Sequence, residues 1–385
     1  MSLACGLIWQ RELSMTAIDP QTRQRLMRTG LTALDENLAC PGYVLFAPMT
    51  GAGDVYLVDL HGTEVHHWKL AYPPGLWGYL LPNGNLFYAG QVRDGAWDQL
   101  PFGPRFKGGV MLEVDWNGKA LWEHRDSNHH HDARRTPAGG AIYLTVEQVP
   151  GELVSQVKGG VPGTDQHGMW ADAIIEVDAN GHRIWEWHAF EHLNPETDLI
   201  TANDPRDEWS HANTVVPLGA EQVMISCRNI STVAIIDRKT GSFVWKLGHD
   251  VLAQQHDPSL LPNGNILVFD NGVNPKGRIG GFSRVIEVDP RTNEIVWEYR
   301  DSPVFNFFSA YISGARRLAN GNTLITEGLF GRMFQVTPDK HVVWEYTNPH
   351  FHPGLDGVSS NRVFRASHYL PHEILLLSSV VREVL

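Results

Sequence analysis

Cysteine and long apolar segments are both scarce in this 385-residue chain. Its three cysteines, Cys5, Cys40 and Cys227, are odd in number and lack metal-ligand spacing, which fits a reducing compartment and buried or incidental thiols. No apolar run approaches the ~18 residues of a membrane-spanning helix. The apolar start, Met1–Trp9, has no basic segment and is followed by polar residues, which argues against a secretion signal. We therefore expect a cytoplasmic protein.

Basic residues are also in deficit. Lysine and arginine number 31 against 43 aspartates and glutamates, a net charge of −12. Because no basic stripe offsets this acidic balance, we expect neither nucleic acid nor a membrane as a partner. The composition, 42% hydrophobic with 37 glycines and 13 tryptophans, allows a large core in a single domain. Nothing in the composition indicates the oligomeric state.

A repeat of roughly 50 residues runs through the chain. In each unit an apolar strand ends in Val/Ile-Asp or Val-Thr, a polar turn follows, usually with Gly or Asn, and a second strand contains a tryptophan. The six tryptophans in this position are Trp68, Trp122, Trp185, Trp245, Trp297 and Trp344. Short strands joined by such turns at this period are typical of propeller blades, so six units predict an all-β, six-bladed β-propeller. The tryptophans themselves are expected to pack between outer strands.

The other half of each blade is a hairpin with a Pro/Asn/Gly turn, the strongest short-range hairpin signal. Five such hairpins lie at 78–88, 134–143, 214–224, 259–267 and 316–324. The first tryptophan unit, 43–70, has no hairpin before it, whereas Arg365–Leu377 has this shape with no tryptophan unit after it. We expect the C-terminal segment to supply the inner strands of the first blade and close the ring, which removes exposed sheet edges. Residues 41–385 would form the propeller, and residues 1–40 an N-terminal arm, with a short polar helix or arm over about 16–38.

Three histidines share one register in the inner strands. They lie six residues before Pro137, Pro217 and Pro262, and the other three blades hold Leu76, Ser313 and Arg365 there; the histidines are His131, His211 and His256. Inner strands line the central channel of a propeller, so equal-register residues converge on its axis. Two residues further on, the register holds small residues, among them Asn213. The three imidazoles are therefore predicted to be neighbours at one mouth of the channel.

The long loops are predicted to lie at the same mouth. They cover 91–108, 148–171, 189–210, 271–282 and 301–312, whereas the turns expected on the opposite face are short. Long loops around one end of a rigid scaffold often carry function. These loops and the C-terminal part are rich in aromatic residues: Trp97, Phe102, Phe106, Trp170, Trp209, Phe282, Phe305, Phe307, Phe308 and Phe351. We take Trp170, Trp209 and Phe308 as candidates for substrate binding.

Arg228 follows the second strand of the His211 blade and is expected to emerge at this mouth beside Asn213. A guanidinium fork suits sulfate, phosphate or carboxylate oxygens. The predicted site therefore fits a small anion attached to an aromatic or apolar body.

The pattern His211-x-Asn213, then Ser226-Cys227-Arg228, then Gln255-His256-Asp257, with His131 in the same register, resembles the bacterial arylsulfate sulfotransferases. The similarity covers roughly residues 43 to 380. It implies transfer of a sulfuryl group from an aryl sulfate to a phenol, without a cofactor, through a sulfohistidine. By this resemblance His256 would be the nucleophile, and His131, His211, Asn213 and Arg228 would bind the sulfuryl oxygens.

Two other functions remain open at the level of the sequence. Three imidazoles around an axis are also a common ligand set for zinc or another divalent transition metal. His131, His211 and His256 would then hold the metal of a lyase or hydrolase, with His129, His130, His167 or His368 as a possible fourth ligand. A non-catalytic ligand-binding propeller is the third reading.

Overall fold

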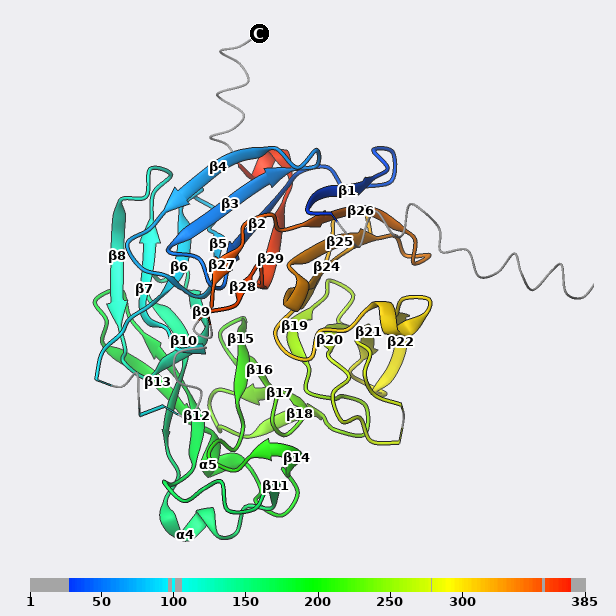
Figure 1. The fold of residues 1–385 in the computed structure, drawn as a ribbon. Helices are drawn as coiled ribbons and strands as arrows, with labels where there is room; N and C mark the ends of the chain where they lie inside the picture. Colours follow the sequence, from blue (N-terminus) through cyan, green and yellow to red (C-terminus); the bar gives the residue numbers. More distant parts are fainter. Residues whose placement is uncertain (1–27, 96–98, 101–105, 278, 355–356, 375–385) are drawn as a thin grey trace, which may run out of the picture.

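The computed structural model is a ring of antiparallel sheets arranged around a central axis (Figure 1). It describes residues 28–95, 99–100, 106–277, 279–354 and 357–374. Six four-stranded sheets make up the ring, and in one of them a fifth strand is added at the outer edge. The six innermost strands contact their neighbours around the axis. The predicted all-β, six-bladed β-propeller is confirmed.

Blades 1 to 3 are each given from the innermost to the outermost strand. Blade 1 consists of β29 (Val363–Tyr369), β2 (Tyr43–Pro48), β3 (Asp54–Asp59) and β4 (Glu64–Lys69). Blade 2 consists of β5 (Pro74–Leu80), β6 (Leu86–Gln91), β7 (Gly109–Val114) and β8 (Ala120–Arg125). Blade 3 consists of β9 (His129–Arg135), β10 (Ala141–Gln148), β12 (Trp170–Val177) and β13 (Arg183–His188).

Blades 4 to 6 follow the same order. Blade 4 consists of β15 (Ala212–Leu218), β16 (Gln222–Cys227), β17 (Thr232–Asp237) and β18 (Phe243–Leu247). Blade 5 consists of β19 (His256–Leu260), β20 (Ile266–Asp270), β21 (Arg284–Asp289) and β22 (Glu294–Tyr299). Blade 6 consists of β23 (Gly314–Arg317), β24 (Thr323–Glu327), β25 (Arg332–Val336) and β26 (Val342–Thr347), and β1 (Gly30–Leu34) pairs with the outer edge of β26.

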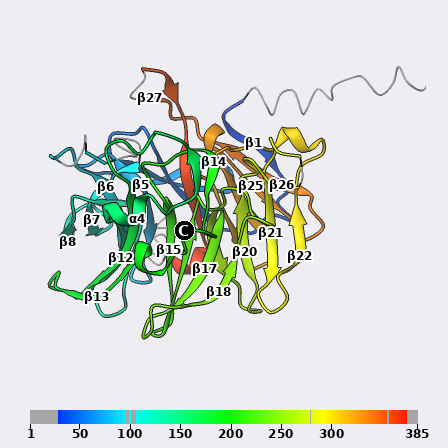
Figure 2. The ribbon, with the colours of Figure 1, turned by 90° about the horizontal axis from the view of Figure 1, so that it is seen from below.

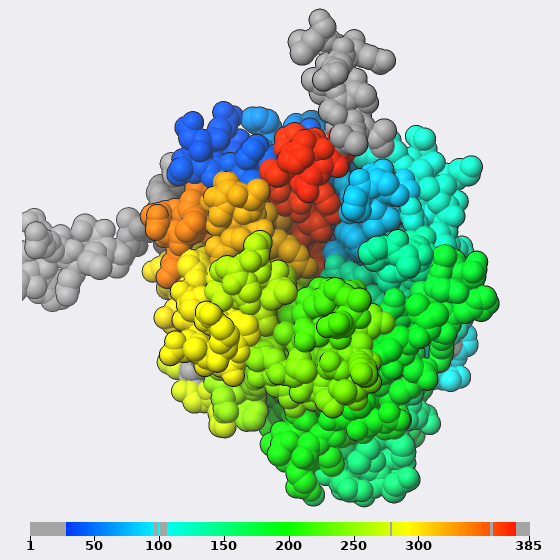
Figure 3. All heavy atoms as spheres, turned by 180° about the vertical axis from the view of Figure 1, so that it is seen from behind, coloured from blue at the N-terminus to red at the C-terminus, as the bar shows by residue number. Residues whose placement is uncertain are grey.

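A C-terminal strand closes blade 1 against the N-terminal part of the ring, as predicted. β29 pairs antiparallel with β2, with Val44 opposite His368. Seen from behind in Figure 3, the red C-terminal segment lies beside the blue N-terminal part of the ring. The C-terminal segment supplies one described inner strand, however, and not the expected hairpin, because the chain turns into the short 3-10 helix η3 (Pro371–Glu373) directly after β29. β2 takes the second position in this blade.

The N-terminal arm departs from the expectation in its described part. The predicted helix or arm over about 16–38 lies partly outside the described residues, which begin at 28. Within them, residues 30–34 form β1 and add a strand to blade 6, where Gly30 lies opposite Thr347. The apolar side chains of Leu31 and Leu34 pack on the core between blades 6 and 1, and this packing holds the segment against β26 as a strand.

The six tryptophans connect each blade to the next by the same hydrogen bond. Each indole Nε1–H donates to an oxygen in the turn between the third and fourth strands of the following blade. The donor and acceptor residues are Trp68 and Asp115, Trp122 and Ala179, Trp185 and Arg238, Trp245 and Asn293, Trp297 and Pro338, and Trp344 and Leu60. A large apolar ring with one polar edge suits such a position, since the ring packs while the N–H finds a partner. The predicted packing role of these residues is confirmed.

The turns on the two faces of the ring differ in length. On one face the hairpins are tight: in the turn after β5, Gly84 has a φ of 84°, and the Asn83 side chain accepts a hydrogen bond from the N–H of Asn85. On the other face lie the longer connections with α4 (Gly151–Val154), β11 (Gly159–Val161), α5 (Ala189–His192), β14 (Ile200–Pro205), η1 (Val304–Asn306), η2 (Gly328–Phe330), β27 (His352–Pro353) and β28 (Ser359–Ser360). In the edge view of Figure 2, β27 projects beyond one end of the blade strands. None of the helices in the described part of the chain is long and apolar enough to span a membrane.

Candidate active site

The structure brings two of the three predicted histidines into ring contact at the axis. The rings of His131, on β9, and His211, just before β15, are 4.8 Å apart between centroids. His256, at the start of β19, is linked to them through Phe364 on β29, whose ring lies 6.1 Å from His131 and 6.3 Å from His256. The equal register in neighbouring blades therefore places the three imidazoles around one aromatic side chain.

An unusual backbone conformation recurs at this register. The residues of four blades here have a positive φ: Leu76 (108°), His131 (50°), His211 (49°) and Ser313 (89°). The ladder between β9 and β10 shifts its register near His131, so that this strand carries a bulge. Bulges re-aim side chains, and left-handed conformations in residues other than glycine concentrate at functional sites. This conformation is part of what turns the two imidazoles toward each other.

His211 is the only one of the three register histidines that reaches solvent, with 8% of its surface exposed. Its Nδ1 lies 2.6 Å from the Oε2 of Glu208, three residues earlier in the same loop. A carboxylate accepts a hydrogen bond and does not donate one when ionised, so Nδ1 carries the proton. The ring edge also faces Phe106, 5.5 Å away. In the neutral ring with its proton on Nδ1, Nε2 carries the lone pair, and no hydrogen bond to Nε2 occurs within the described residues.

His131 ends a chain of hydrogen-bonded groups that starts at a buried carboxylate. The Nδ1 of His131 lies 2.6 Å from the Nδ1 of His130, and the Nε2 of His130 lies 3.0 Å from the Oδ1 of Asp172. Burial raises the pKa of Asp172, but the hydrogen bonds from His130 and Ser210 more than offset this, so the pKa is lower than usual. Burial, followed by the proximity of His211, holds the pKa of His131 well below its ordinary value. The chain can therefore pass a proton between the two imidazoles, with Asp172 to stabilise the cationic form of His130.

Both ring nitrogens of His256 are engaged by the protein. Nδ1 donates to the Oδ1 of Asn271 at 2.8 Å, and Nε2 accepts the backbone N–H of Ile312 at 3.2 Å. Asn271 is itself fixed, because its amide donates to the carbonyls of Ser309 and Ile312. Burial lowers the pKa of His256 well below its ordinary value, although the bond to Asn271 raises it. This neutral, doubly bonded imidazole differs from the free nucleophile that the family resemblance implies for His256.

Asn213 and Arg228 take positions other than the expected open ones. Asn213 is fully buried: its amide donates to the carbonyl of Gln255, and its oxygen accepts from the hydroxyl of Thr214. The guanidinium of Arg228 is partly exposed, but it donates to Asp204 and to the Gln254 amide oxygen. Asn213 therefore connects blades 4 and 5, whereas Arg228 retains its place at the mouth as a cation paired with Asp204.

The three aromatic candidates for substrate binding differ in their burial. Trp209 is fully buried in the core between blades 3 and 4 and donates to the carbonyl of Asp198, so it is no substrate platform. Trp170 and Phe308 are half-buried, and neither has a ring contact with the histidines in the described structure. Trp97 and Phe102 lie outside the described residues. The aromatic ring that stacks on the site is Phe106, 4.7 Å from His131 between ring centroids.

Below the histidines, the axis is filled by ion pairs. Arg365, the register mate of the histidines in blade 1, is 1% exposed and contacts Asp132 at 3.3 Å and Asp257 at 3.2 Å. These aspartates directly follow His131 and His256 in the sequence. Trp77 also donates to Asp132, at 3.0 Å, and the Arg365 guanidinium lies over the Trp77 ring. The aspartates thus make contacts between blades, and the cluster closes the channel beneath the histidine mouth.

The arrangement of the possible donor atoms bears on the predicted three-histidine metal site. Within the described residues, no group of three or more histidine, cysteine or carboxylate side chains has an arrangement that suits a metal ion. His256 in particular offers no lone pair toward His131 or His211, because Asn271 and Ile312 occupy its nitrogens. The donor geometry therefore does not fit a three-histidine metal site.

Several residues of the site were missed by the sequence reasoning. Glu208, Asp172 and Asn271 orient the histidines, and Phe364 fills the space between them. His129 and His130, which the sequence offered as possible fourth metal ligands, are both fully buried in β9. The run of three consecutive histidines was a usable signal for a buried relay. The spacing of Glu208 to His211 was another, since the two residues are only three positions apart at the end of a long loop.

Comparisons with known proteins give one family model and several similar solved structures. The family model for arylsulfotransferase (ASST) matches residues 100–349. Among solved structures, the chain is similar to a protein of unknown function from Bacteroides caccae, with a TM-score of 0.53, 11% identity, and coverage of 86% of this chain and 99% of that chain. It also matches a streptogramin B lyase (TM-score 0.45, 13% identity, 89% and 93% coverage) and the β-propeller domain of Cps50 (Swd1) from Myceliophteria thermophila (0.44, 11%, 85% and 88%). No curated protein matches the sequence. Because the family model covers most of the ring, from blade 2 to blade 6, the chain belongs to the arylsulfotransferase (ASST) family.

Proposed function

We propose that this protein transfers a sulfuryl group from an aryl sulfate to a phenolic acceptor, and that His211 is the histidine that carries the group in between. The observation that supports this choice is the state of His211: it is fixed through Nδ1, reaches solvent, and has an Nε2 without a hydrogen-bond partner in the described structure. Neutral imidazole is a nucleophile near pH 7. The reaction would follow the family to which the chain belongs.

In the first half-reaction, the Nε2 lone pair of His211 attacks sulfur and the bond between sulfur and the aryl oxygen breaks. An N–S bond forms, and the electron pair leaves with the phenolate. The imidazole ring becomes positively charged, and the carboxylate of Glu208, 2.6 Å from Nδ1, stabilises that charge. Glu208 thus has the orienting and charge-stabilising role that a carboxylate has in other histidine-based sites.

The leaving phenolate needs a proton, and His131 is placed to give it. Its ring is 4.8 Å from that of His211, and it receives a replacement proton from His130 through the contact between their Nδ1 atoms. Asp172 holds the His130 ring from the other side. In the second half-reaction the proton returns by the same path, because the acceptor phenol loses its proton as its oxygen attacks the sulfur of the sulfohistidine.

The surroundings fit an aryl sulfate. Phe106, Tyr311 and Phe364 provide aromatic surface beside the histidines, and Phe106 lies 6.3 Å from Tyr311 between ring centroids. Arg228 is the cation for sulfuryl oxygens, which would replace the Gln254 amide oxygen at its Nη2. His256 acts here as a positioning residue: its bond to the N–H of Ile312 fixes the segment that carries Tyr311.

The test is to trap the intermediate and locate it. The protein is mixed with 4-nitrophenyl sulfate, quenched with base, digested, and the peptides are weighed, while 4-nitrophenolate release is followed in parallel. We expect one sulfuryl group on the peptide that contains His211, and a loss of turnover of about 10³-fold or more in His211→Asn. The matched variant His256→Asn should retain the labelled His211 peptide, since His256 only supports the site.

A sulfuryl group on His256 in the unmodified protein would overturn the assignment to His211 while leaving the reaction in place. No labelled peptide and no release from a panel of aryl sulfates would overturn the reaction itself. Glu208→Gln separates the orienting role from a structural one: it should lower the rate of the first half-reaction and leave the affinity for the aryl sulfate unchanged.

A further inference from the structure

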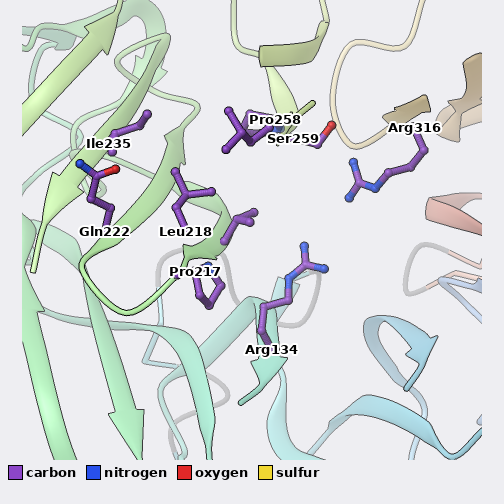
Figure 4. Close-up of a pocket in the computed structure, with 11 residues that line it drawn as sticks. Arg134, Pro217, Leu218, Gln222, Ile235, Pro258, Ser259 and Arg316 are labelled. Carbon is purple, nitrogen blue, oxygen red and sulfur yellow. The ribbon is translucent and has the colours of Figure 1, made fainter. Parts of the chain in front are cut away.

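A pocket of about 630 Å³ lies at the opposite end of the axis from the histidines. It is formed where the inner hairpins of blades 4 and 5 turn, and side chains from blades 3 and 6 complete it (Figure 4). Its lining includes Pro217, Leu218 and Gln222 of blade 4, and Pro258 and Leu260 of blade 5. The ion pairs of Arg365 separate it from the histidine mouth.

Two arginines reach this pocket from opposite sides. Figure 4 shows the guanidinium groups of Arg134, on β9, and Arg316, on β23, directed toward the same space. Arg134 uses Nη2 for Asp132 and Nε for the carbonyl of Val215, and within the described residues its Nη1 has no hydrogen-bond partner. Arg316 forms a two-pronged pair with Asp257, at 2.6 and 2.5 Å. Their side chains are 17% and 25% exposed, so both are accessible from the pocket.

The charges of this cluster do not balance. Within the described residues, Arg134, Arg316 and Arg365 share only two carboxylates in their ion pairs, those of Asp132 and Asp257. Three guanidiniums and two carboxylates leave one positive charge in a largely buried setting. The other hydrogen bonds to Asp132 come from the neutral N–H groups of Trp77 and Val215, so they do not change this net positive charge. A charge held away from water favours a counter-ion.

The other side of the pocket is apolar. Leu260 is 45% exposed, an unusual fraction for a large hydrophobic side chain on a strand, and it lines the pocket together with Leu218 and Ile235. The site has two guanidiniums at one end and aliphatic and proline surface at the other. It therefore suits a small organic anion with a charged group at one end and an apolar part at the other.

We infer that this pocket is a second anion site, which binds the sulfonate, sulfate or carboxylate group of a small organic acid between Arg134 and Arg316 and its apolar part against Leu218 and Leu260. The site is independent of the reaction at the histidines, because its residues belong to the other end of the inner strands. The charged group would accept a hydrogen bond from Nη1 of Arg134.

The probe is 4-bromobenzenesulfonate, whose carbon–sulfur bond cannot take part in sulfuryl transfer. Binding is followed by calorimetry, and the bromine is located by anomalous diffraction in a soaked crystal. We expect bromine density in the pocket and, in Gln222→Glu, an affinity lower by about tenfold or more, since this near-isosteric change adds a negative charge to the lining. The neutral 4-bromobenzenesulfonamide should also bind the unmodified protein at least about tenfold more weakly than the sulfonate does.

Two controls separate this site from the histidine mouth. Gln156→Glu adds the same charge on an exposed residue just after α4, outside the pocket, and should leave the affinity unchanged. His211→Ala should also leave it unchanged. Density only at the histidines, or equal affinity in the unmodified protein and in Gln222→Glu, would overturn the proposal, as would the absence of binding to the unmodified protein.

Discussion

The outer and inner edges of the blades follow opposite rules. At the outer edge all six blades place the same residue, tryptophan, in the same hydrogen bond to the next blade. At the innermost register the six residues are of four chemical kinds: Leu76, His131, His211, His256, Ser313 and Arg365. Repetition at the outside fixes the ring, and variation at the inside creates a site.

The difference has a physical origin. An outer strand contacts only the adjacent blade, so one solution to the packing between neighbours serves six times. Inner strands converge on one axis, where six identical side chains would crowd the same space. Three histidines, an arginine, a leucine and a serine fill that space with a directed set of hydrogen bonds instead, as the bonds of His256 to Asn271 and Ile312 illustrate.

Lowering the pH should give the largest difference between the two edges, because it should destabilise the fold through the buried histidines of the inner strands. Burial lowers the pKa of His129 to about 3 and holds those of His131 and His256 well below their ordinary value. Unfolding exposes them, so below about pH 6.5 the unfolded chain binds more protons and the fold loses stability as pH falls. For three such histidines, the free energy of unfolding should fall by about 4 kcal/mol per pH unit. Denaturant unfolding between about pH 6 and pH 5, where the exposed histidines of the unfolded chain are mostly protonated, measures this slope.

One matched variant lies on an inner strand, and the other lies in the turn before an outer strand. His129→Gln keeps an acceptor for the N–H of Gly109 and removes one titrating group, so the slope should decrease by about 1.4 kcal/mol per pH unit. His341→Gln, at an exposed position at the outer edge of blade 6, should leave the slope unchanged. A free energy of unfolding that stays constant from pH 7 to pH 5 would contradict the buried, neutral state of these histidines.

The same contrast explains what could be predicted from the sequence. The outer edge is periodic, so the tryptophans and turns alone indicated six blades and the closure through β29. The register of the inner strands also predicted that His131 and His211 would lie together. The partners of these histidines come from non-repeating loops and neighbouring blades: Glu208 lies in an insertion, and Asn271 follows β20. No period relates such residues, so the sequence does not reveal them. Trp209 was predicted to bind substrate but is buried in the core, and this error has the same cause, because Trp209 also lies in a non-repeating loop.

The second effect concerns the ion pairs at the axis. Asp257 has a φ of 55°, which asparagine tolerates, so Asp257→Asn removes the charge and keeps the backbone. It leaves the buried Arg365 with Asp132 alone and Arg316 without its two-pronged partner. Breaking a buried pair on one side costs about 3–5 kcal/mol, which urea unfolding at pH 7.5 should report.

The control is an ion pair at the outer edge. Glu123 and Arg125 lie 2.6 Å apart on β8, and their side chains are 43% and 50% exposed. Glu123→Gln should change the free energy of unfolding by less than about 1 kcal/mol. If Glu123→Gln and Asp257→Asn had equal effects, the axial cluster would be solvated, contrary to its burial.

The smallest effect tests whether the six outer positions are energetically equivalent as well as chemically alike. Trp344 is fully buried and donates to Leu60 across the junction where blade 6 meets blade 1, whereas Trp297 is partly exposed and donates to Pro338. Trp344→Phe should lower the free energy of unfolding by about 2 kcal/mol, from the lost hydrogen bond and a residual cavity, and Trp297→Phe by about 1 kcal/mol, from the hydrogen bond alone. Both variants should keep the rate of 4-nitrophenolate release, because no outer tryptophan touches the site. A larger cost at Trp297 than at Trp344 would contradict this order, because it would mean that full burial of the indole at the junction of blades 6 and 1 adds nothing to its stabilising effect.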